Sequence, residues 1–338
     1  MTPRETSALA SVIDSRRALL IWMGVILVLL TALSLSLGRA QGPVFGFNTA
    51  DASVKALLFW EVRLPRTLAA LAIGAVLGLA GAVLQGLLRN PLAEPGVLGA
   101  SSAAALGAVG VFYFGLSGYS LLLLPLGGMS AAVLSLLFLL SLAGRGASTT
   151  VLILTGVALN AFAGAMIALA LTLAPSPFAL SEIIFWLMGS ITDRPKELLY
   201  LITPFMLIGC FMMLRNARLL DALTLGDAAA ATLGFQVHRQ KIFIVLGSGI
   251  AVGACVCFAG SISFVGLVVP HVLRPWVAHR PSALLIPSLL GGALLLLSAD
   301  ILVRCLPAGP ELNLGVVTAL LGAPFFIALA LRSPRTSP

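Results

Sequence analysis

The feature that most limits the fold of this chain is a run of about 20 apolar residues, free of charge, that recurs along its length. One helix of about 20 apolar residues crosses a bilayer, whereas the strands of a membrane barrel alternate apolar and polar residues over about ten positions. Such runs occupy Leu19–Leu37, Thr67–Leu88, Gly96–Phe114, Tyr119–Ala143, Thr149–Pro175, Leu198–Leu214, Ser282–Ala299 and Leu312–Leu331. With 59% hydrophobic and only 9% charged residues, the chain falls outside the soluble, disulfide-scaffold and disordered classes.

The region Ile242–His279 is too long for one crossing, since a single helix of that length would measure about 57 Å. A break at Gly260–Ser263 divides it into two spans, Ile242–Ala259 and Ile262–Ala278. The sequence therefore predicts an all-α polytopic membrane protein with about ten transmembrane helices, in which residues 1–338 form a single domain.

The charge balance sets the expected orientation. The chain has 20 Lys and Arg against 12 Asp and Glu, a net charge of +8. In a membrane protein such an excess is typical of basic residues retained on the cytoplasmic side, and this explanation is preferred to nucleic-acid binding. Placing both termini inside puts most of the basic residues in inner segments, so we expect an N-in/C-in topology and no nucleic-acid partner.

Several kinds of chemistry are missing from the sequence. No GxxxxGK[ST] phosphate-binding loop, HExxH or GxSxG motif occurs, and the three histidines lie too far apart for a joint metal site. The four cysteines are interpreted as packing residues, with a metal or redox role as the alternative. Ionisable residues are nearly absent from the middle of the spans, whereas ion-coupled transporters place such groups there. We therefore expect no enzyme, no metal and no cofactor, and an energy source outside the chain.

The longest predicted inner loop, Arg215–Lys241, contains a helix-compatible stretch at Asp221–Leu233 that Gly234 closes. A folded loop of this length indicates a docking surface, and a solvated connector is the alternative. Two GxxxG pairs, Gly74 with Gly78 and Gly249 with Gly253, predict close helix approaches.

Four strings then occur in a characteristic order. They are Arg63-Leu-Pro-Arg66-Thr67, the segment from Gln85-Gly86 to Pro95-Gly96, Gly266-Leu-Val-Val-Pro270-His271, and Gly315-Val-Val-Thr-Ala319 with Gly322-Ala-Pro-Phe325. This set resembles the FecCD-type permeases, the membrane subunits of binding-protein-dependent ABC importers for ferric siderophores, haem and cobalamin. The resemblance implies a type II importer permease domain in the bacterial inner membrane. It also implies a homodimer, two cytoplasmic ATP-binding subunits and a periplasmic substrate-binding protein.

The resemblance also carries roles to particular residues. Arg63, Arg66 and Arg304 match arginines that pair with glutamates of the binding protein, and snorkelling at the membrane interface is the alternative. The loop at about 215–241 matches the ATPase-coupling segment, through Leu225, Gly226, Asp227, Leu233 and Gly234. The alanine run Ala228–Ala231 departs from the family, which has polar or bulkier residues there.

Further matches concern the pathway. Asn90, Pro91 and Leu92, with Thr149 and Thr150, match the two halves of the cytoplasmic gate, and an ordinary helix turn is the alternative. Pro270 is expected to kink its helix, and His271 is interpreted as structural rather than as a substrate contact. Asn313 stands where the family usually has proline.

The sequence thus predicts a permease subunit that translocates an iron chelate, such as a ferric siderophore or haem, or cobalamin, by alternating access. Two other classes were considered. A self-sufficient secondary transporter or channel would work without an ATPase, and a membrane-embedded enzyme would need a cluster of reactive groups that the sequence does not provide.

Overall fold

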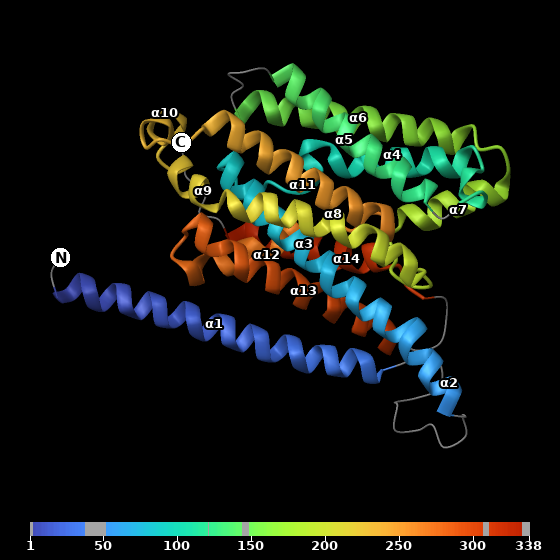
Figure 1. The fold of residues 1–338 in the computed structure, drawn as a ribbon, viewed down its shortest axis with the longest axis horizontal. Coiled ribbons are helices and arrows are strands. Elements are labelled where there is room, and N and C mark those ends of the chain that lie inside the picture. Colours follow the sequence, from blue (N-terminus) through green and yellow to red (C-terminus); the bar gives the residue numbers. More distant parts are fainter. Residues whose placement is uncertain (1–2, 38–51, 121, 144–148, 307–310, 333–338) are drawn as a thin grey trace.

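Long apolar segments with few interruptions favour helices, and helices dominate the fold. The computed structural model describes residues 3–37, 52–120, 122–143, 149–306 and 311–332, and these ranges contain helices, turns and no strand (Figure 1). The α-helices are α1 (Pro3–Ser36), α2 (Ala52–Leu57), α3 (Leu64–Leu88), α4 (Ala100–Tyr113), α5 (Leu123–Ala143), α6 (Thr149–Thr172), α7 (Pro177–Leu187), α8 (Lys196–Arg215), α9 (Ala217–Leu223), α10 (Asp227–Thr232), α11 (Val237–Ala259), α12 (Val265–Leu273), α13 (Pro281–Cys305) and α14 (Leu314–Arg332). A π-helical segment, η2 (Leu58–Arg63), joins α2 to α3, and short 3-10 helices include η3 (Pro95–Leu98), η4 (Leu116–Gly118) and η6 (Arg274–Val277).

Seven helices within the described residues are long and apolar enough to cross a membrane, and four further apolar helices are shorter. Every predicted span contains one of these helices, so the all-α membrane class is confirmed. The count of about ten crossings and the N-in/C-in topology stay predictions. Helix α7 was not predicted, because its 11 residues are too few to register as a span.

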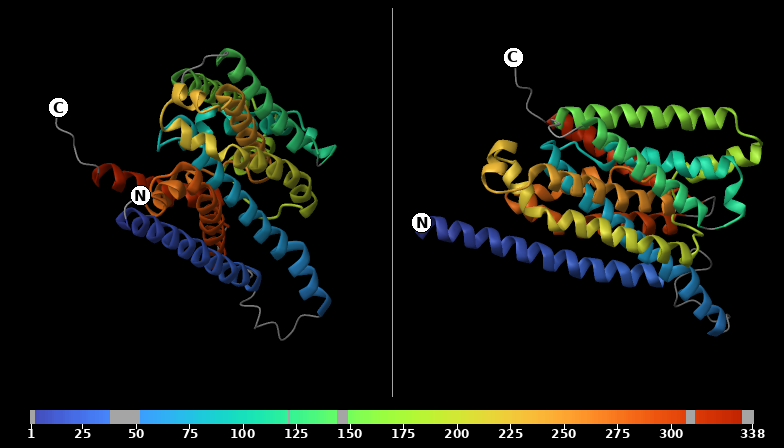
Figure 2. Two further views of the ribbon diagram at one scale, coloured as in Figure 1. Left: turned by 60° about the vertical axis from the view of Figure 1, so that its left-hand side comes forward. Right: turned by 45° about the horizontal axis from the view of Figure 1, so that its top comes forward.

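Helix α3 runs through the centre of the bundle and is flanked by α12 and α13 (Figures 1 and 2). In α3 and α11, 78% of the apolar stretch is buried, against 11% in α1, which lies along α13 at one edge of the bundle. A side chain on Gly74 or Gly78 would overlap the backbone of α13. The close approach expected from this GxxxG pair is therefore confirmed.

The bundle has two ends with different polar groups. At the first, here called the Arg66 end, α3 begins beside the end of α1 and the end of α13. At the second, here called the Asp227 end, α3 finishes beside α10, and α13 begins beside α9. Helix α1 starts at the Asp227 end, and α7 lies toward the Arg66 end (Figure 1).

The loop between α8 and α11 corrects one expectation. We predicted one helical stretch over Asp221–Leu233, but the structure has two helices, α9 and α10, separated at Gly226. Gly226 adopts φ 102° and ψ 160°, which side-chain-bearing residues rarely occupy, so the chain turns sharply there. Gly234, with φ 88°, ends the second helix as predicted.

Candidate functional site

A buried cluster of charges lies at the Arg66 end. The carboxylate of Asp300 on α13 accepts a hydrogen bond from Nε of Arg66 at 2.8 Å and also pairs with Arg304, one turn further along the same helix. Arg66 in addition pairs with Glu311, in the segment before α14, and Glu311 accepts a hydrogen bond from the hydroxyl of Thr192 at 3.1 Å. Four separate segments of the chain are therefore joined by one group of side chains.

The three arginines predicted to face outward are largely turned into the protein. The side chains of Arg66 and Arg304 are 11% and 3% exposed. Arg304 donates to the backbone oxygen of Ser34 at 2.9 Å, and Arg63 donates to the last carbonyls of α1 at 3.2 and 3.3 Å. The structure brings the three residues to one end of the bundle, but their charges already have partners within the chain.

Nothing in the sequence indicated that Asp300 and Glu311 would be those partners. Asp300 is separated from Arg66 by 234 positions and Glu311 by 245. The only available hint was that an acidic residue at the end of an apolar span is costly unless it is paired.

At the opposite end, Asp227 ties the loop to two long helices. Its carboxylate lies 2.5 Å from Nζ of Lys241 on α11 and 3.5 Å from Nη2 of Arg89, which follows α3. Asp227, a predicted coupling residue, thus links the loop to α11 and to the end of α3. The sequence did not point to Lys241 or Arg89 as its partners.

Asp221 on α9 fastens the same loop to α13. It accepts hydrogen bonds from the backbone N–H and the hydroxyl of Ser282 at 2.8 and 2.6 Å, and from Nε of Arg280 at 2.9 Å. These donors belong to the first turn of α13, where backbone N–H groups otherwise lack partners. Burial alone raises the pKa of Asp221, but the hydrogen bonds from Ser282 and Arg280 outweigh it and hold the pKa below its usual value.

Apolar side chains divide the loop into an anchored and an exposed part. Three leucines of α9 are fully buried, namely Leu219, Leu220 and Leu223. In contrast, Leu225 and Leu233, on either side of α10, are 69% and 61% exposed. The arrangement presents two leucines on a fixed support.

The predicted gate residues after α3 form a compact turn. The side-chain oxygen of Asn90 accepts a hydrogen bond from the backbone N–H of Leu92 at 2.9 Å, and its carbonyl accepts one from Ala93 at 3.1 Å. Pro91 fits between them because this position needs no N–H donor. Thr150 lies on the first turn of α6 and is exposed, and Thr149, the first residue of that helix, has a side chain outside the described part of the structure.

Pro270 lies inside α12 and removes one helical hydrogen bond, the one that the carbonyl of Gly266 would accept. Nε2 of Gln85 on α3 lies 3.4 Å from that oxygen and 3.4 Å from the oxygen of Leu267, and Oε1 of Gln85 accepts from Arg274. Gln85 therefore compensates for the proline and links α3 to α12. The kink expected at Pro270 stays a prediction.

In the part of the chain that the structure describes, no group of three His, Cys, Asp or Glu residues is arranged to hold a metal ion. His271 packs edge-on against the rings of Phe325 and Phe326, with centroids 6.1 and 6.3 Å away.

A bundle of long apolar helices packed around a central helix defines a polytopic membrane protein. Residues 24–332 match the FecCD transport family, and the chain belongs to that family. Members of this family are transport subunits and not enzymes, so this chain is a transport subunit, and the expectation that it is no enzyme is confirmed.

Relatives of this chain include permeases that are named for different cargoes. The chain is 39% identical to the vitamin B12 import system permease protein BtuC of Klebsiella pneumoniae, over 92% of this chain and 94% of that protein. It is 38% identical to the hemin transport system permease protein HmuU of Yersinia pestis, over 92% and 95%. A solved structure of a transporter assigned to the metal-chelate type of ABC transporter, in an inward-facing conformation, superposes with a TM-score of 0.82 at 31% identity, covering 94% of this chain and 99% of that one.

Proposed function

We propose that this chain is the permease subunit of a binding-protein-dependent ABC importer in the bacterial inner membrane. It works as a homodimer, with two cytoplasmic ATP-binding subunits and a periplasmic substrate-binding protein. The single transmembrane domain of residues 1–338 translocates its cargo by alternating access.

The observation that carries this proposal is the anchored loop at the Asp227 end. Asp221 and Asp227 fasten α9 and α10 to α3, α11 and α13, while Leu225 and Leu233 stay exposed. A force applied to the exposed leucines would therefore reach three helices of the bundle through short ionic contacts. In the proposed assembly the ATP-binding subunit receives these leucines, Gly226 and Gly234 set the turns, and this end faces the cytoplasm.

The Arg66 end then faces the binding protein, and Arg63, Arg66 and Arg304 are its proposed docking residues. Because Asp300 and Glu311 already hold two of these arginines, docking through them requires carboxylates of the binding protein to compete with those partners. An interaction of that kind would couple capture of the binding protein to the contacts between α3, α13 and α14.

The cytoplasmic gate is proposed at Asn90, Pro91 and Leu92 together with Thr149 and Thr150. The turn after α3 is followed by η3, whose Val97 backbone packs against Gly156 of α6. Movement of α6 would therefore displace the segment that follows the turn.

For the cargo we propose an iron chelate, such as a ferric siderophore or haem, or cobalamin. The support comes from relatives whose names specify vitamin B12 and hemin transport, and from the metal-chelate type of the structural neighbour.

The test is purification of the tagged chain from its native membrane, followed by identification of the copurifying proteins. A P-loop ATPase and a periplasmic protein with a readable ligand are the expected companions, and that ligand would identify the cargo. A chain that purifies alone and still moves solute in liposomes would overturn the proposal in favour of a secondary transporter or channel.

A paired variant tests the loop itself. Leu225→Ser with Leu233→Ser should remove the ATPase from the purified complex, because both side chains are exposed and contribute little to the fold. Leu116→Ser with Leu122→Ser, which changes two exposed leucines in the connection between α4 and α5, is the matched control. Equal ATPase recovery in the two double variants would contradict the coupling role.

A further inference from the structure

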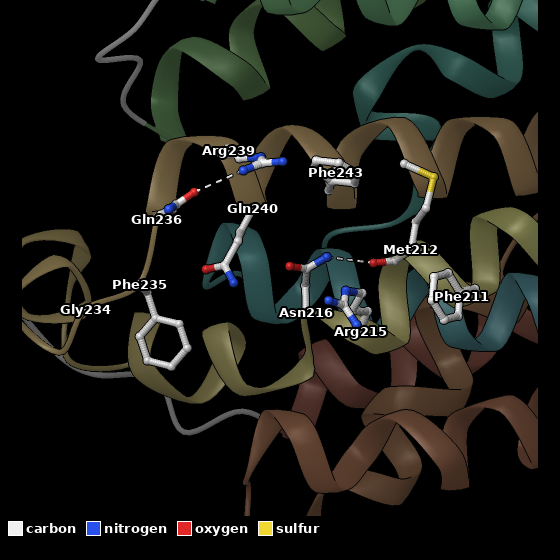
Figure 3. A pocket seen from close by; sticks show the side chains of 10 residues that line it. All are labelled: Phe211, Met212, Arg215, Asn216, Gly234, Phe235, Gln236, Arg239, Gln240 and Phe243. Atoms are coloured by element: carbon white, nitrogen blue, oxygen red, sulfur yellow. Dashed lines mark hydrogen bonds between the residues drawn. The ribbon is translucent and has the colours of Figure 1, made fainter.

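A polar cavity opens at the Asp227 end, at the point where α8 finishes and α11 begins. It has a volume of about 400 Å³ and is lined from three directions, by the last turn of α8, by the segment from Gly234 to Gln236 and by the first turns of α11 (Figure 3). Of the residues that line it, only Gly234 has a role assigned above.

Two guanidinium groups give the cavity a positive charge. Arg215 is the last residue of α8, Arg239 lies in the first turn of α11, and both are exposed. Within the described residues, no carboxylate lies within ion-pair distance of either group, and the two acids of the loop, Asp221 and Asp227, are engaged with other cations. Unneutralised cations in a concave site attract an anion, and guanidinium groups are well suited to phosphate.

Amide groups complete the polar wall. Gln240 reaches down from α11 toward Asn216 at the end of α8, with Arg215 beside it (Figure 3). The Oε1 atom of Gln240 is buried and has no hydrogen-bond partner among the residues that the structure describes. Because a buried acceptor without a donor is unfavourable, a ligand that brings a hydroxyl group to this atom would bind better than a bare anion.

The apolar side of the cavity distinguishes a lipid from a free ion. Phe211 precedes Arg215 by four residues and Phe243 follows Arg239 by four, so each helix carries a phenylalanine about 6 Å deeper than its arginine on the same face. Phe211 and Phe243 are 63% and 40% exposed. A face with arginine above and an aromatic ring below matches the depth profile of a phospholipid, with phosphate over acyl chain.

We propose that this cavity binds the headgroup of one anionic phospholipid of the phosphatidylglycerol class. Arg215 and Arg239 hold the phosphate, Gln240 Oε1 accepts a hydrogen bond from a glycerol hydroxyl, and the acyl chains follow Phe211 and Phe243. A headgroup with an ammonium group suits the site less, because its positive charge would meet the two arginines. The proposal depends on neither the cargo nor the partner subunits.

Native mass spectrometry of the full chain in detergent tests it, with phosphatidylglycerol or phosphatidylcholine of the same acyl chains as probes. Wild-type protein should retain phosphatidylglycerol at least about tenfold more tightly, because the choline cation is repelled by the two arginines and choline has no hydroxyl group to donate to Gln240. Arg215→Gln with Arg239→Gln should weaken retention of phosphatidylglycerol about tenfold or more, since the charge-assisted hydrogen bonds to its phosphate are lost. Arg17→Gln with Arg218→Gln removes two exposed charges outside the cavity and should leave the preference intact.

Two more measurements identify the ligand. Gln240→Leu should weaken the binding of phosphatidylglycerol but not that of phosphatidic acid, which lacks the hydroxyl groups of the headgroup glycerol. Inorganic phosphate at millimolar concentration should compete poorly, because it lacks the acyl chains.

Equal retention of the two lipids by the wild-type chain, or equal loss in both arginine double variants, would overturn the proposal. So would full displacement by inorganic phosphate, which would indicate a free-anion site.

Discussion

Replacing Asp300 by asparagine is the sharpest test of the charge cluster at the Arg66 end. The side chain of Asp300 is 1% exposed and lies between Arg66 and Arg304, which are 11% and 3% exposed. Asp300→Asn keeps the shape of the side chain but leaves two guanidinium groups facing each other with less negative charge between them. Removing one partner of a buried ion pair costs about 3–5 kcal/mol, and we expect a loss of unfolding free energy in that range.

A matched control lies nearby, at the pair of Glu61 and Lys196. These side chains are 43% and 31% exposed, and water screens such a pair, so Glu61→Gln should leave the stability almost unchanged. The assay is equilibrium unfolding of the purified chain in mixed micelles, with increasing fractions of sodium dodecyl sulfate. Both variants remove one negative charge, so their difference isolates the effect of burial.

A double variant tests whether uncompensated buried charge causes this loss of stability. If the penalty comes from uncompensated buried charge, then Asp300→Asn combined with Arg304→Met should be less destabilised than the sum of the two single variants predicts. Additive losses, or equal unfolding midpoints for Asp300→Asn and Glu61→Gln, would refute the reasoning.

Two other predictions concern packing and pH. Gly81→Ala should destabilise the chain by about 1–3 kcal/mol, because the new methyl group would overlap the backbone of Gly266. Gly110→Ala is the control, because its methyl group meets open space. Thermal unfolding should show a lower melting temperature for Gly81→Ala and an unchanged one for Gly110→Ala. The pKa of Asp221 lies below its usual 3.8, because the hydrogen bonds from Ser282 outweigh the opposing effect of burial. The contribution of the Asp221 carboxylate to folding stability is therefore present above about pH 3.8 and is lost as the pH falls through its folded-state pKa. The melting temperatures of wild type and Asp221→Asn should converge below pH 3.8, and a constant gap from pH 3 to 6 would contradict this.

The helical class and the positions of the apolar helices other than α7 were predictable because a bilayer imposes one length and one composition on every crossing segment. The loop between α8 and α11 was located for a similar reason, since polar sequence between two spans has to lie outside the membrane. The sequence predicted one helical stretch over Asp221–Leu233, whereas the structure divides it at Gly226, which tolerates positive φ. Helix α7 was missed because it is too short for a crossing.

The side-chain partners were not predictable in the same way. Periodicity gives the face of a helix but not its neighbour, so nothing in the sequence indicated that Asp300 would lie between Arg66 and Arg304. The same is true of Gln85, which supplies a donor for the carbonyl that Pro270 leaves free on another helix. The family resemblance implied arginines that are available to a binding protein, whereas in the structure Arg66 and Arg304 lie among intramolecular partners.

The sequence by itself determined the membrane class, the apolar segments, the exposed loop and the family, because each of these depends on residues that are close together along the chain or on motifs of fixed spacing. The tertiary structure alone decided which charges are paired across the bundle, which leucines stay exposed and that Arg215 and Arg239 line one cavity. These features depend on contacts between different helices, and such contacts are set by the packing of the whole bundle around α3.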